Sequence, residues 1–158
     1  MRYNEGMAPF IKARKIIRLD PLNYRIPGTA AFLTICTYKK ASTFIDEGVN
    51  KTVLGALEAT ATKHGMEIWA YCLMPDHLHL VIFNPSGGDI ISMIRDFKRE
   101  CAARPSCIRW QRSYYDHFIR KNEAVEGIVE YALQNPVRKG LAARWQDYPW
   151  SFSKWHPR

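Results

Sequence analysis

The sequence lacks any apolar run long enough to cross a membrane, and it has no internal repeat or low-complexity tract. The N-terminal stretch FIKARKIIRLD alternates charged and apolar residues, which is not the pattern of a signal peptide. We therefore expect a cytoplasmic protein with no membrane association. A chain of 158 residues, 47% of them hydrophobic, fits one compact domain. We expect that domain to span residues 1–158, with a basic N-terminal arm (1–28) and a tryptophan-rich C-terminal tail (138–158).

Cysteine is scarce and scattered along the chain. The four cysteines are Cys36, Cys72, Cys101 and Cys107, and no pair has the C-x-x-C spacing of a zinc knuckle. The absence of such a pair argues against a structural zinc site. The mostly apolar neighbours of these cysteines are typical of thiols that stay reduced.

Acidic residues are few relative to basic ones. The net charge is +8, from 23 Lys and Arg against 15 Asp and Glu. Residues 95–121 are strongly basic, and aromatic residues lie among their cations, including Trp110, Tyr114, Tyr115 and Phe118. Clustered cations favour a polyanion because binding releases its counterions, and aromatic rings stack on unpaired bases. The composition therefore favours a nucleic-acid partner; the alternative is a basic protein without one.

Hydrophobic periodicity predicts alternating strands and helices. Strands are expected at residues 29–39, 66–74, 77–83 and 114–120, and helices at 50–64, 89–101 and 122–135. Asn50, Asp89 and Asn122 are the expected N-caps, Gly65 is expected to end the first helix, and the last helix is expected to end near Asn135–Pro136. The order β-α-β-β-α-β plus a helix predicts an α+β fold. It is the ferredoxin-like split β-α-β arrangement, an antiparallel sheet with helices and an added C-terminal helix.

Two histidines interrupt the apolar strand HLHLVIF. Side chains alternate across a strand, so His77 and His79 share one face while Leu78, Leu80 and Ile82 point into the core. Neutral imidazole is a common metal ligand, so a neighbouring pair forms half of a site for a divalent ion. The alternative is a pair of partly solvated histidines on a sheet face.

The last helix offers a partner for this pair. Tyr131 and Asn135 are four residues apart and therefore neighbours on one helical face, at the margin of its buried stripe. Spacing alone leaves each with a simple structural explanation. Tyr131 is then an amphipathic edge residue, and Asn135 ends a helix before Pro136.

Four segments, in order, resemble one family. They are YRIPGTAAFLTICTYKK, YCLMPDHLHLVI with the histidine strand, WQRSYYDHFIRKNE, and YALQNPVRKGL followed by YPWS. An H-hydrophobic-H strand followed by a helix with Y-x-x-x-[Q/N] resembles the HUH single-tyrosine transposases, and among them the REP-associated tyrosine transposases. The resemblance spans most of the chain.

The resemblance implies a DNA nicking and rejoining enzyme. His77, His79 and Asn135 would bind Mg²⁺ or Mn²⁺, and Tyr131 would attack the scissile phosphate of single-stranded DNA to form a 5′-phosphotyrosine. The implied substrate is a hairpin-bearing strand of the REP type. Candidate phosphate contacts are Arg95, Lys98, Arg99, Arg109, Arg112 and Arg120. Relatives include dimers that exchange the tyrosine helix, so a monomer and a homodimer are both open.

Several alternatives stay open. Many members of the superfamily have Gln four residues after the tyrosine where this chain has Asn135, and Gln134 is the competing ligand. Tyr114 and Tyr115 are rival nucleophiles, but neither has an amide residue four positions later. The alternative function is a non-catalytic ferredoxin-like nucleic-acid-binding protein. An RNA-binding module of that kind would carry aromatic residues where this chain has HLHLVIF.

Overall fold

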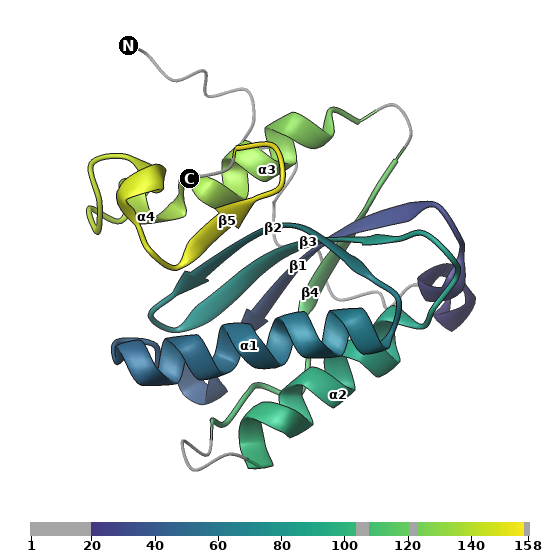
Figure 1. Ribbon diagram of the computed structural model, residues 1–158, viewed down its shortest axis with the longest axis horizontal. Helices are drawn as coiled ribbons and strands as arrows, with labels where there is room; N and C mark the ends of the chain where they lie inside the picture. Colours follow the sequence, from purple (N-terminus) through teal and green to yellow (C-terminus); the bar gives the residue numbers. More distant parts are fainter. Residues whose placement is uncertain (1–19, 104–107, 121–122, 157–158) are drawn as a thin grey trace.

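A five-stranded antiparallel sheet forms the centre of the protein. The computed structural model describes residues 20–103, 108–120 and 123–156 (Figure 1). The strands are β1 (Thr29–Cys36), β2 (Glu67–Met74), β3 (His77–Asn84), β4 (Tyr115–Ile119) and β5 (Ser151–Ser153), in the order β4-β1-β3-β2-β5. The helices are α1 (Glu47–Lys63), α2 (Ile90–Ala103), α3 (Val125–Leu133) and α4 (Asn135–Arg138). The predicted α+β fold is confirmed.

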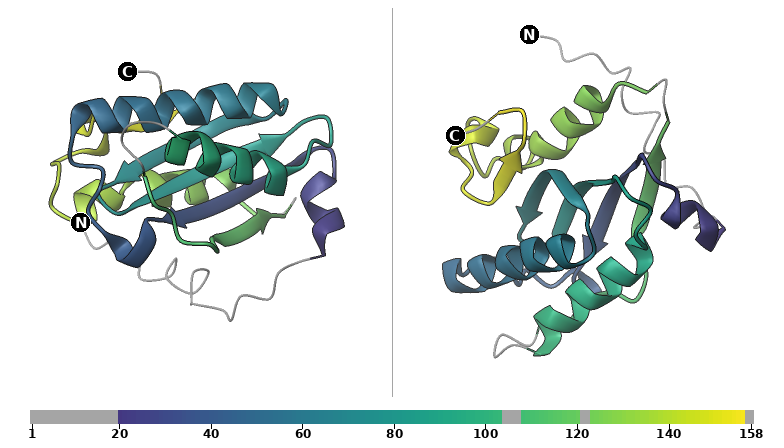
Figure 2. Two further views of the ribbon diagram at one scale, coloured as in Figure 1. Left: turned by 90° about the horizontal axis from the view of Figure 1, so that it is seen from below. Right: turned by 45° about the vertical axis from the view of Figure 1, so that its right-hand side comes forward.

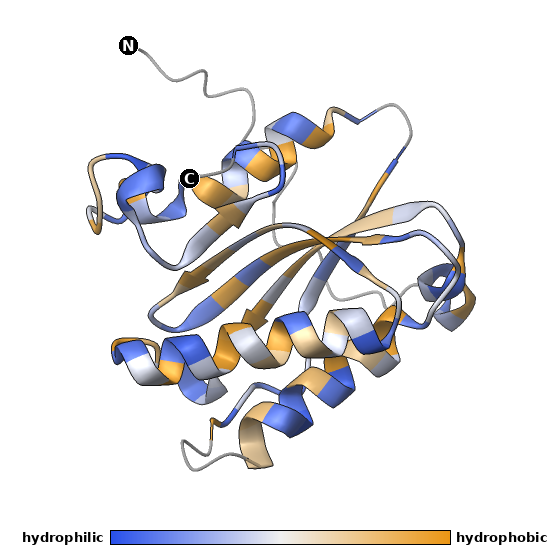
Figure 3. Ribbon diagram, viewed as in Figure 1, coloured by the Kyte–Doolittle hydropathy of each residue, from blue (hydrophilic) through white to orange (hydrophobic). Residues whose placement is uncertain are grey.

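The two faces of the sheet are covered by different parts of the chain. Helices α1 and α2 lie against one face, and α3, α4 and the C-terminal segment lie on the other (Figures 1 and 2). Hydrophobic residues run along the strands and alternate with hydrophilic ones along α1 and α2 (Figure 3). The larger core cluster, under α1 and α2, contains Leu78, Leu80 and Ile82, all fully buried. The predicted alternation of β3 is therefore confirmed, and its histidines lie on the α3 side.

The first helix begins earlier than predicted, so Asn50 is not its N-cap. Asp46 caps α1, because its carboxylate accepts a hydrogen bond from the Val49 N–H at 2.9 Å. Asn50 is instead a buried residue of the first turn, where its amide donates to the Phe44 carbonyl at 3.2 Å. The predicted end is confirmed, since Gly65 follows the helix with a φ of +66°.

The second helix starts as predicted. The Asp89 carboxylate accepts hydrogen bonds from the N–H groups of Ile91 at 3.0 Å and Ser92 at 3.4 Å.

Within the described residues, no helix has the length and apolarity needed to span a bilayer.

The predicted last helix is divided in two. Helix α3 ends at Leu133, and the chain turns at Gln134 into the short helix α4. Pro136 lies in the first turn of α4, where its missing N–H costs no hydrogen bond, so it does not end the helical segment as predicted. The predicted cap Asn122 lies outside the described residues, as does the N-terminal arm up to residue 19.

The C-terminal tail contributes a strand that the sequence did not predict. Strand β5 pairs with β2 through Ala70–Ser153, Tyr71–Phe152 and Cys72–Ser151. Three residues are too few to show a periodic pattern. The Tyr148 hydroxyl anchors the tail by donating to the Leu73 carbonyl at 2.9 Å.

Candidate active site

The two histidines meet at the start of β3. His77 and His79 project to the α3 side, and their Nε2 atoms are 3.1 Å apart. The rings are nearly perpendicular, with centroids 4.6 Å apart. Both imidazoles therefore direct the same nitrogen toward one point.

The other nitrogen of each ring is held by a separate partner. His77 Nδ1 lies 2.5 Å from the Asp76 carboxylate, in the turn between β2 and β3. His79 Nδ1 lies 2.9 Å from the hydroxyl of Thr34, its partner in the β1–β3 register. Contacts at Nδ1 fix the orientation of an imidazole and leave Nε2 as the coordinating atom.

Burial keeps His79 uncharged. Only 6% of its surface is exposed, and this desolvation lowers the pKa of His79 to about 3, with smaller contributions from the charges of His77 and Arg138. A hydrogen bond with the Asn135 side chain acts in the opposite direction. The imidazole is neutral at physiological pH, which is the state that binds a metal.

Tyr131 lies beside this pair. Helix α3 packs against β2 and β3, and the Tyr131 ring centroid is 6.3 Å from that of His79. Phe32 on β1 supports both residues, stacking on His79 at 5.4 Å and meeting the tyrosine edge-to-face at 6.1 Å. The Arg138 guanidinium covers the tyrosine ring at 4.4 Å and donates to the Tyr131 carbonyl at 2.6 Å. The structure thus brings the predicted tyrosine to the predicted histidines.

The two candidate amide ligands point in different directions. The Asn135 Nδ2 donates to the Tyr131 carbonyl at 3.0 Å and to the Ala132 carbonyl at 3.1 Å, which leaves Oδ1 for the histidine side. Asn135 is buried, and its side chain interacts with His79. Gln134 instead donates to Glu130 at 2.6 Å on the exposed side of the helix. The geometry favours Asn135 over Gln134 as the candidate amide ligand.

The donor set fits a small divalent cation. Two ligands at right angles on an ion about 2.1 Å away lie about 3.0 Å apart, and the Nε2 atoms are separated by 3.1 Å. Within the described ranges, no cluster of three or more His, Cys, Asp or Glu is placed to hold a metal ion. The amide oxygen of Asn135 is the candidate third ligand, because the Asn135 side chain hydrogen-bonds with His79. A set of three protein ligands, two imidazoles and one amide, suits a catalytic ion better than a structural one.

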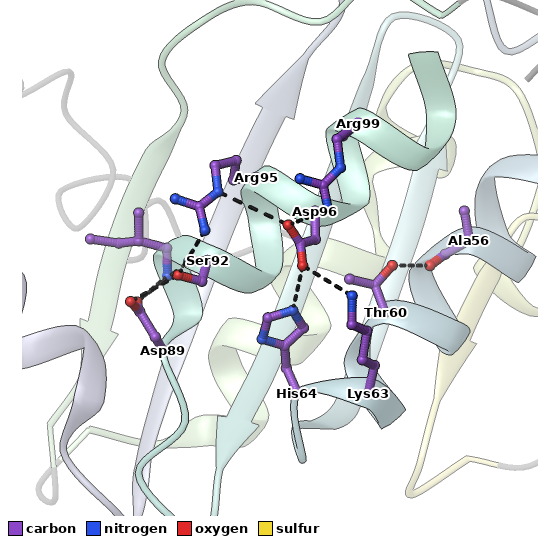
Figure 4. Close-up of polar contacts among 10 residues, drawn as sticks. Ala56, Thr60, Lys63, His64, Asp89, Ser92, Arg95, Asp96 and Arg99 are labelled. Atoms are coloured by element: carbon purple, nitrogen blue, oxygen red, sulfur yellow. Dashed lines mark hydrogen bonds and ion pairs between the residues drawn. The ribbon is translucent and has the colours of Figure 1, made fainter. Parts of the chain in front are cut away.

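Two predicted DNA contacts, Arg95 and Arg99, lie on the opposite layer. Both belong to α2 and flank Asp96, whose carboxylate is 2.9 Å from the Arg99 guanidinium (Figure 4). The same carboxylate is 3.0 Å from His64 and 3.4 Å from Lys63, at the end of α1. The structure does not bring Arg95 and Arg99 to the histidines. Arg120 is also away from the histidines: it follows Ile119, which pairs with Ala30 near the start of β1, whereas His77 pairs with Cys36 at the end of β1.

The remaining predicted cations gather at the histidine end of the sheet. These are Lys98, Arg109 and Arg112. Lys98 reaches from α2 to donate to the Gln111 carbonyl at 2.8 Å, and Gln111 N–H donates to the carbonyl of Cys36, the residue paired with His77.

The rival tyrosines are separated from each other: Tyr114 lies under Lys98, whereas Tyr115 packs near Phe32 on the histidine face.

Comparison with known proteins assigns this arrangement to a family. The family described as "Transposase IS200 like" matches residues 29–135, from the start of β1 through Asn135. The chain belongs to this family of transposases. The matched segment contains the strands that carry the histidine pair and the helix that carries Tyr131.

Two curated proteins and one solved structure are similar to this chain. A Haemophilus influenzae protein, provisionally named a REP-associated tyrosine transposase, is 27% identical over 149 residues, covering 82% of this chain and 84% of its own length. The Escherichia coli K12 REP-associated tyrosine transposase is 30% identical over 90 residues, covering 54% and 53% of the two chains. A solved REP-associated tyrosine transposase bound to a REP hairpin superposes with a TM-score of 0.69 at 25% identity, covering 81% and 78%. The predicted resemblance is confirmed, and this transposase belongs to an enzyme class that cleaves and rejoins DNA.

Three residues that contact the candidate site were not predicted. Thr34 and Phe32 come from β1, and only the strand register places them against His79. Arg138 lies beyond the predicted end of the last helix, so helical spacing gave no signal for it; the continuation of the chain into α4 brings it to the Tyr131 ring.

Proposed function

We propose that this protein nicks and rejoins single-stranded DNA through a covalent 5′-phosphotyrosine on Tyr131, at a site that takes Mg²⁺ or Mn²⁺. One observation carries the proposal. The Nε2 atoms of His77 and His79 converge at 3.1 Å with both Nδ1 atoms engaged, directly beside the tyrosine ring.

Each residue has one role in this proposal. His77, His79 and Asn135 hold the divalent ion, which when bound supplies Lewis-acid polarisation of the scissile phosphate. Arg138 holds the tyrosine ring by covering one face. The Asn135 amide is held by two backbone carbonyls, so its oxygen is preorganised.

The covalent step is a transesterification. The Tyr131 oxygen forms a bond to phosphorus as the bond from phosphorus to the 3′ oxygen breaks. The phenol loses its proton to solvent, and the departing 3′ oxygen takes up one to leave as a hydroxyl, so no cofactor is consumed. An aryl oxide is a better leaving group than an alkoxide. A second 3′-OH therefore displaces Tyr131 and rejoins a strand.

The proposed substrate is a hairpin-bearing single strand of the REP type. Two findings support it: a similar transposase has been solved with a REP hairpin, and this chain has a net charge of +8. Lys98, Arg109 and Arg112 are the predicted phosphate contacts nearest the histidines. For Arg95, Arg99 and Arg120, contact with DNA remains a prediction, at surfaces away from the tyrosine.

The test is formation of a protein–DNA adduct. A labelled hairpin-bearing oligonucleotide is incubated with the protein and Mn²⁺ and resolved on a denaturing gel. We expect an adduct that requires the metal and disappears in Tyr131→Phe and His77→Ala. Tyr115→Phe is the matched control, because Tyr115 lies on the same sheet face, and it should still form adduct.

A wild-type protein that binds the oligonucleotides and forms no adduct with any hairpin would contradict the proposal. It would then be a DNA-binding member of the family that has kept the site without the chemistry. An adduct that survives in Tyr131→Phe would show a different nucleophile.

A further inference from the structure

The turn after β1 is fastened to the histidine end of the sheet. This turn, residues 37–41, is called the Tyr38 turn below. Thr37 is fully buried, and its N–H donates to the Asp76 carbonyl at 3.0 Å. Its hydroxyl lies 3.0 Å from the same carbonyl and 2.8 Å from that of Ala41. Asp76 immediately precedes His77, the first residue of β3, so the Tyr38 turn is attached directly beside the histidine pair.

The backbone of the Tyr38 turn is strained. Lys39 and Lys40 have φ angles of 55° and 54°, the left-handed region that lysine rarely enters. Two successive non-glycine residues there persist only where their surroundings hold them, and such strain gathers at functional sites. The contacts of Thr37 supply that restraint. The turn therefore holds the backbone of Tyr38, Lys39 and Lys40 in one arrangement.

Those side chains combine an aromatic ring with cations. Tyr38 is 43% exposed, and its ring centroid lies 4.5 Å from the Arg109 guanidinium and 5.5 Å from the Lys39 amine. Tyr38 N–H donates to the Arg109 carbonyl at 2.8 Å, which joins the two backbones. An aromatic face among cations is how proteins bind unpaired nucleotides, with the ring taking a base and the cations taking phosphates.

These cations differ from the arginines of α2. Arg99 is paired with the Asp96 carboxylate at 2.9 Å. By contrast, no ion pair links Lys39, Lys40 or Arg109 to a carboxylate of the described residues. Lys39 and Lys40 follow Cys36, the strand partner of His77, by three and four residues. Arg109 lies two residues before Gln111, whose N–H donates to the Cys36 carbonyl.

We infer that the Tyr38 turn is a nucleotide subsite for the unpaired strand that leaves the active site. A base next to the scissile phosphate stacks on Tyr38, and Arg109, Lys39 and Lys40 contact the adjoining phosphates. This inference rests on the proposed function, because it assumes that single-stranded DNA passes the histidine pair. It adds a part of the substrate beyond the hairpin and the cleaved bond.

The experiment measures binding and not cleavage. Fluorescence anisotropy in EDTA compares two labelled DNAs, a hairpin with an unpaired flank and the same hairpin without it. We expect Tyr38→Ala to bind the flanked DNA about tenfold more weakly and the bare hairpin as wild type does. Tyr38→Phe should bind both normally because it keeps the ring. Phe152→Ala is the matched control, an aromatic of similar exposure at 39% on β5, and should change neither affinity.

An abasic scan locates the stacked base. At one position of the flank, an abasic nucleotide should weaken wild-type binding by the same factor as Tyr38→Ala, and should not weaken the variant further. This non-additivity identifies a direct contact.

The lysines are tested through salt dependence. Asn tolerates the left-handed conformation better than Lys, so Lys39→Asn with Lys40→Asn removes charge without straining the turn. The slope of log affinity against log salt for the flanked DNA should fall by about 1.4, since each cation on a single strand contributes about 0.7. An unchanged slope would exclude phosphate contacts by these lysines.

Two results would overturn the subsite. One is a wild-type protein that gains no affinity from the flank, and the other is a Tyr38→Ala variant that loses equally on both DNAs or on neither. Failure of the proposed chemistry is separate, since it appears as a missing adduct in the wild type while the binding comparison still gives its result.

Discussion

The hydroxyl of Thr34 and Nδ1 of His79 lie 2.9 Å apart, across the pairing of β1 with β3. The Asp76 carboxylate lies 2.5 Å from Nδ1 of His77. Each imidazole of the pair is thus oriented by a residue of a different segment, one strand neighbour and one turn neighbour. The two rings held in this way are those whose Nε2 atoms converge at 3.1 Å.

Loss of the Thr34 hydroxyl should weaken metal binding. Thr34→Val keeps the shape of the side chain and removes its contact with His79, so the imidazole is less firmly oriented. We expect Mn²⁺ affinity to fall by about tenfold, measured from the free-ion signal in an electron paramagnetic resonance titration. Thr34→Ser keeps a hydroxyl and should bind nearly as wild type does. Equal affinity in Thr34→Val would mean that strand packing alone orients His79.

Replacement of Arg138 should slow the covalent step without weakening DNA binding. Arg138→Lys keeps the charge but loses the planar guanidinium. That group covers the Tyr131 ring at 4.4 Å and donates a hydrogen bond to the Tyr131 backbone carbonyl. A contact of about 1 kcal/mol corresponds to about fivefold slower adduct formation. Single-turnover rates at saturating DNA measure this. Arg144→Lys is the control, as its partner is the exposed Asp147 at 2.7 Å. A fall in affinity without a fall in rate would assign Arg138 to binding.

The two amides should differ sharply in the adduct assay. Asn135→Ala removes the oxygen that faces the histidines, and we expect at least about a hundredfold loss of metal-dependent adduct. Gln134→Ala removes only the contact with Glu130 and should leave the rate within about twofold of wild type. The reverse result would make Gln134 the metal ligand.

The sequence predicted what depends on local pattern. Alternation placed His77 and His79 on one face, and four-residue spacing placed Tyr131 beside Asn135. The Asp89 cap and the Gly65 stop were likewise local signals, and the structure confirms both.

The errors and omissions concern relations between distant segments. Asn50 is an acceptable cap by type, but packing against Phe44 buries it and leaves the cap to Asp46. Contact of Thr34 with His79 follows from strand register, which no single segment specifies. For the same reason the sequence did not show that Arg95 and Arg99, on α2, lie away from the histidines.

Asp96 should stabilise the fold only above its titration range. The hydrogen bond from His64, with the charges of Arg99 and Lys63, lowers the pKa of Asp96 below its ordinary value of 3.8. A carboxyl with a lowered folded-state pKa contributes stability above its unfolded pKa and loses it as the pH falls through the folded value. Asp96→Asn should therefore unfold at a lower temperature at pH 7, and the difference should disappear well below pH 3.8.

Thermal melts across pH measure this effect. The matched control is Asp147→Asn, whose exposed partner Arg144 also lowers the pKa of that carboxyl. Exposed pairs add little to stability, so this variant should melt close to wild type at every pH. A pH-independent difference for Asp96→Asn would show that packing, and not charge, links α2 to α1.

The tyrosine should act on the histidines of its own chain. Tyr131 and His79 lie together within one chain, with ring centroids 6.3 Å apart and Phe32 in contact with both. Neither Tyr131→Phe nor His77→Ala should form adduct alone, and a mixture of the two should also form none. Such a mixture can restore activity only where the intact tyrosine of one chain enters the intact histidine pair of another. A mixture that regains about a quarter of the wild-type adduct, the share expected if subunits exchange at random and only one of four tyrosine–histidine combinations is intact, would instead establish exchange of α3 between two subunits. The gel assay that detects the adduct distinguishes these outcomes directly.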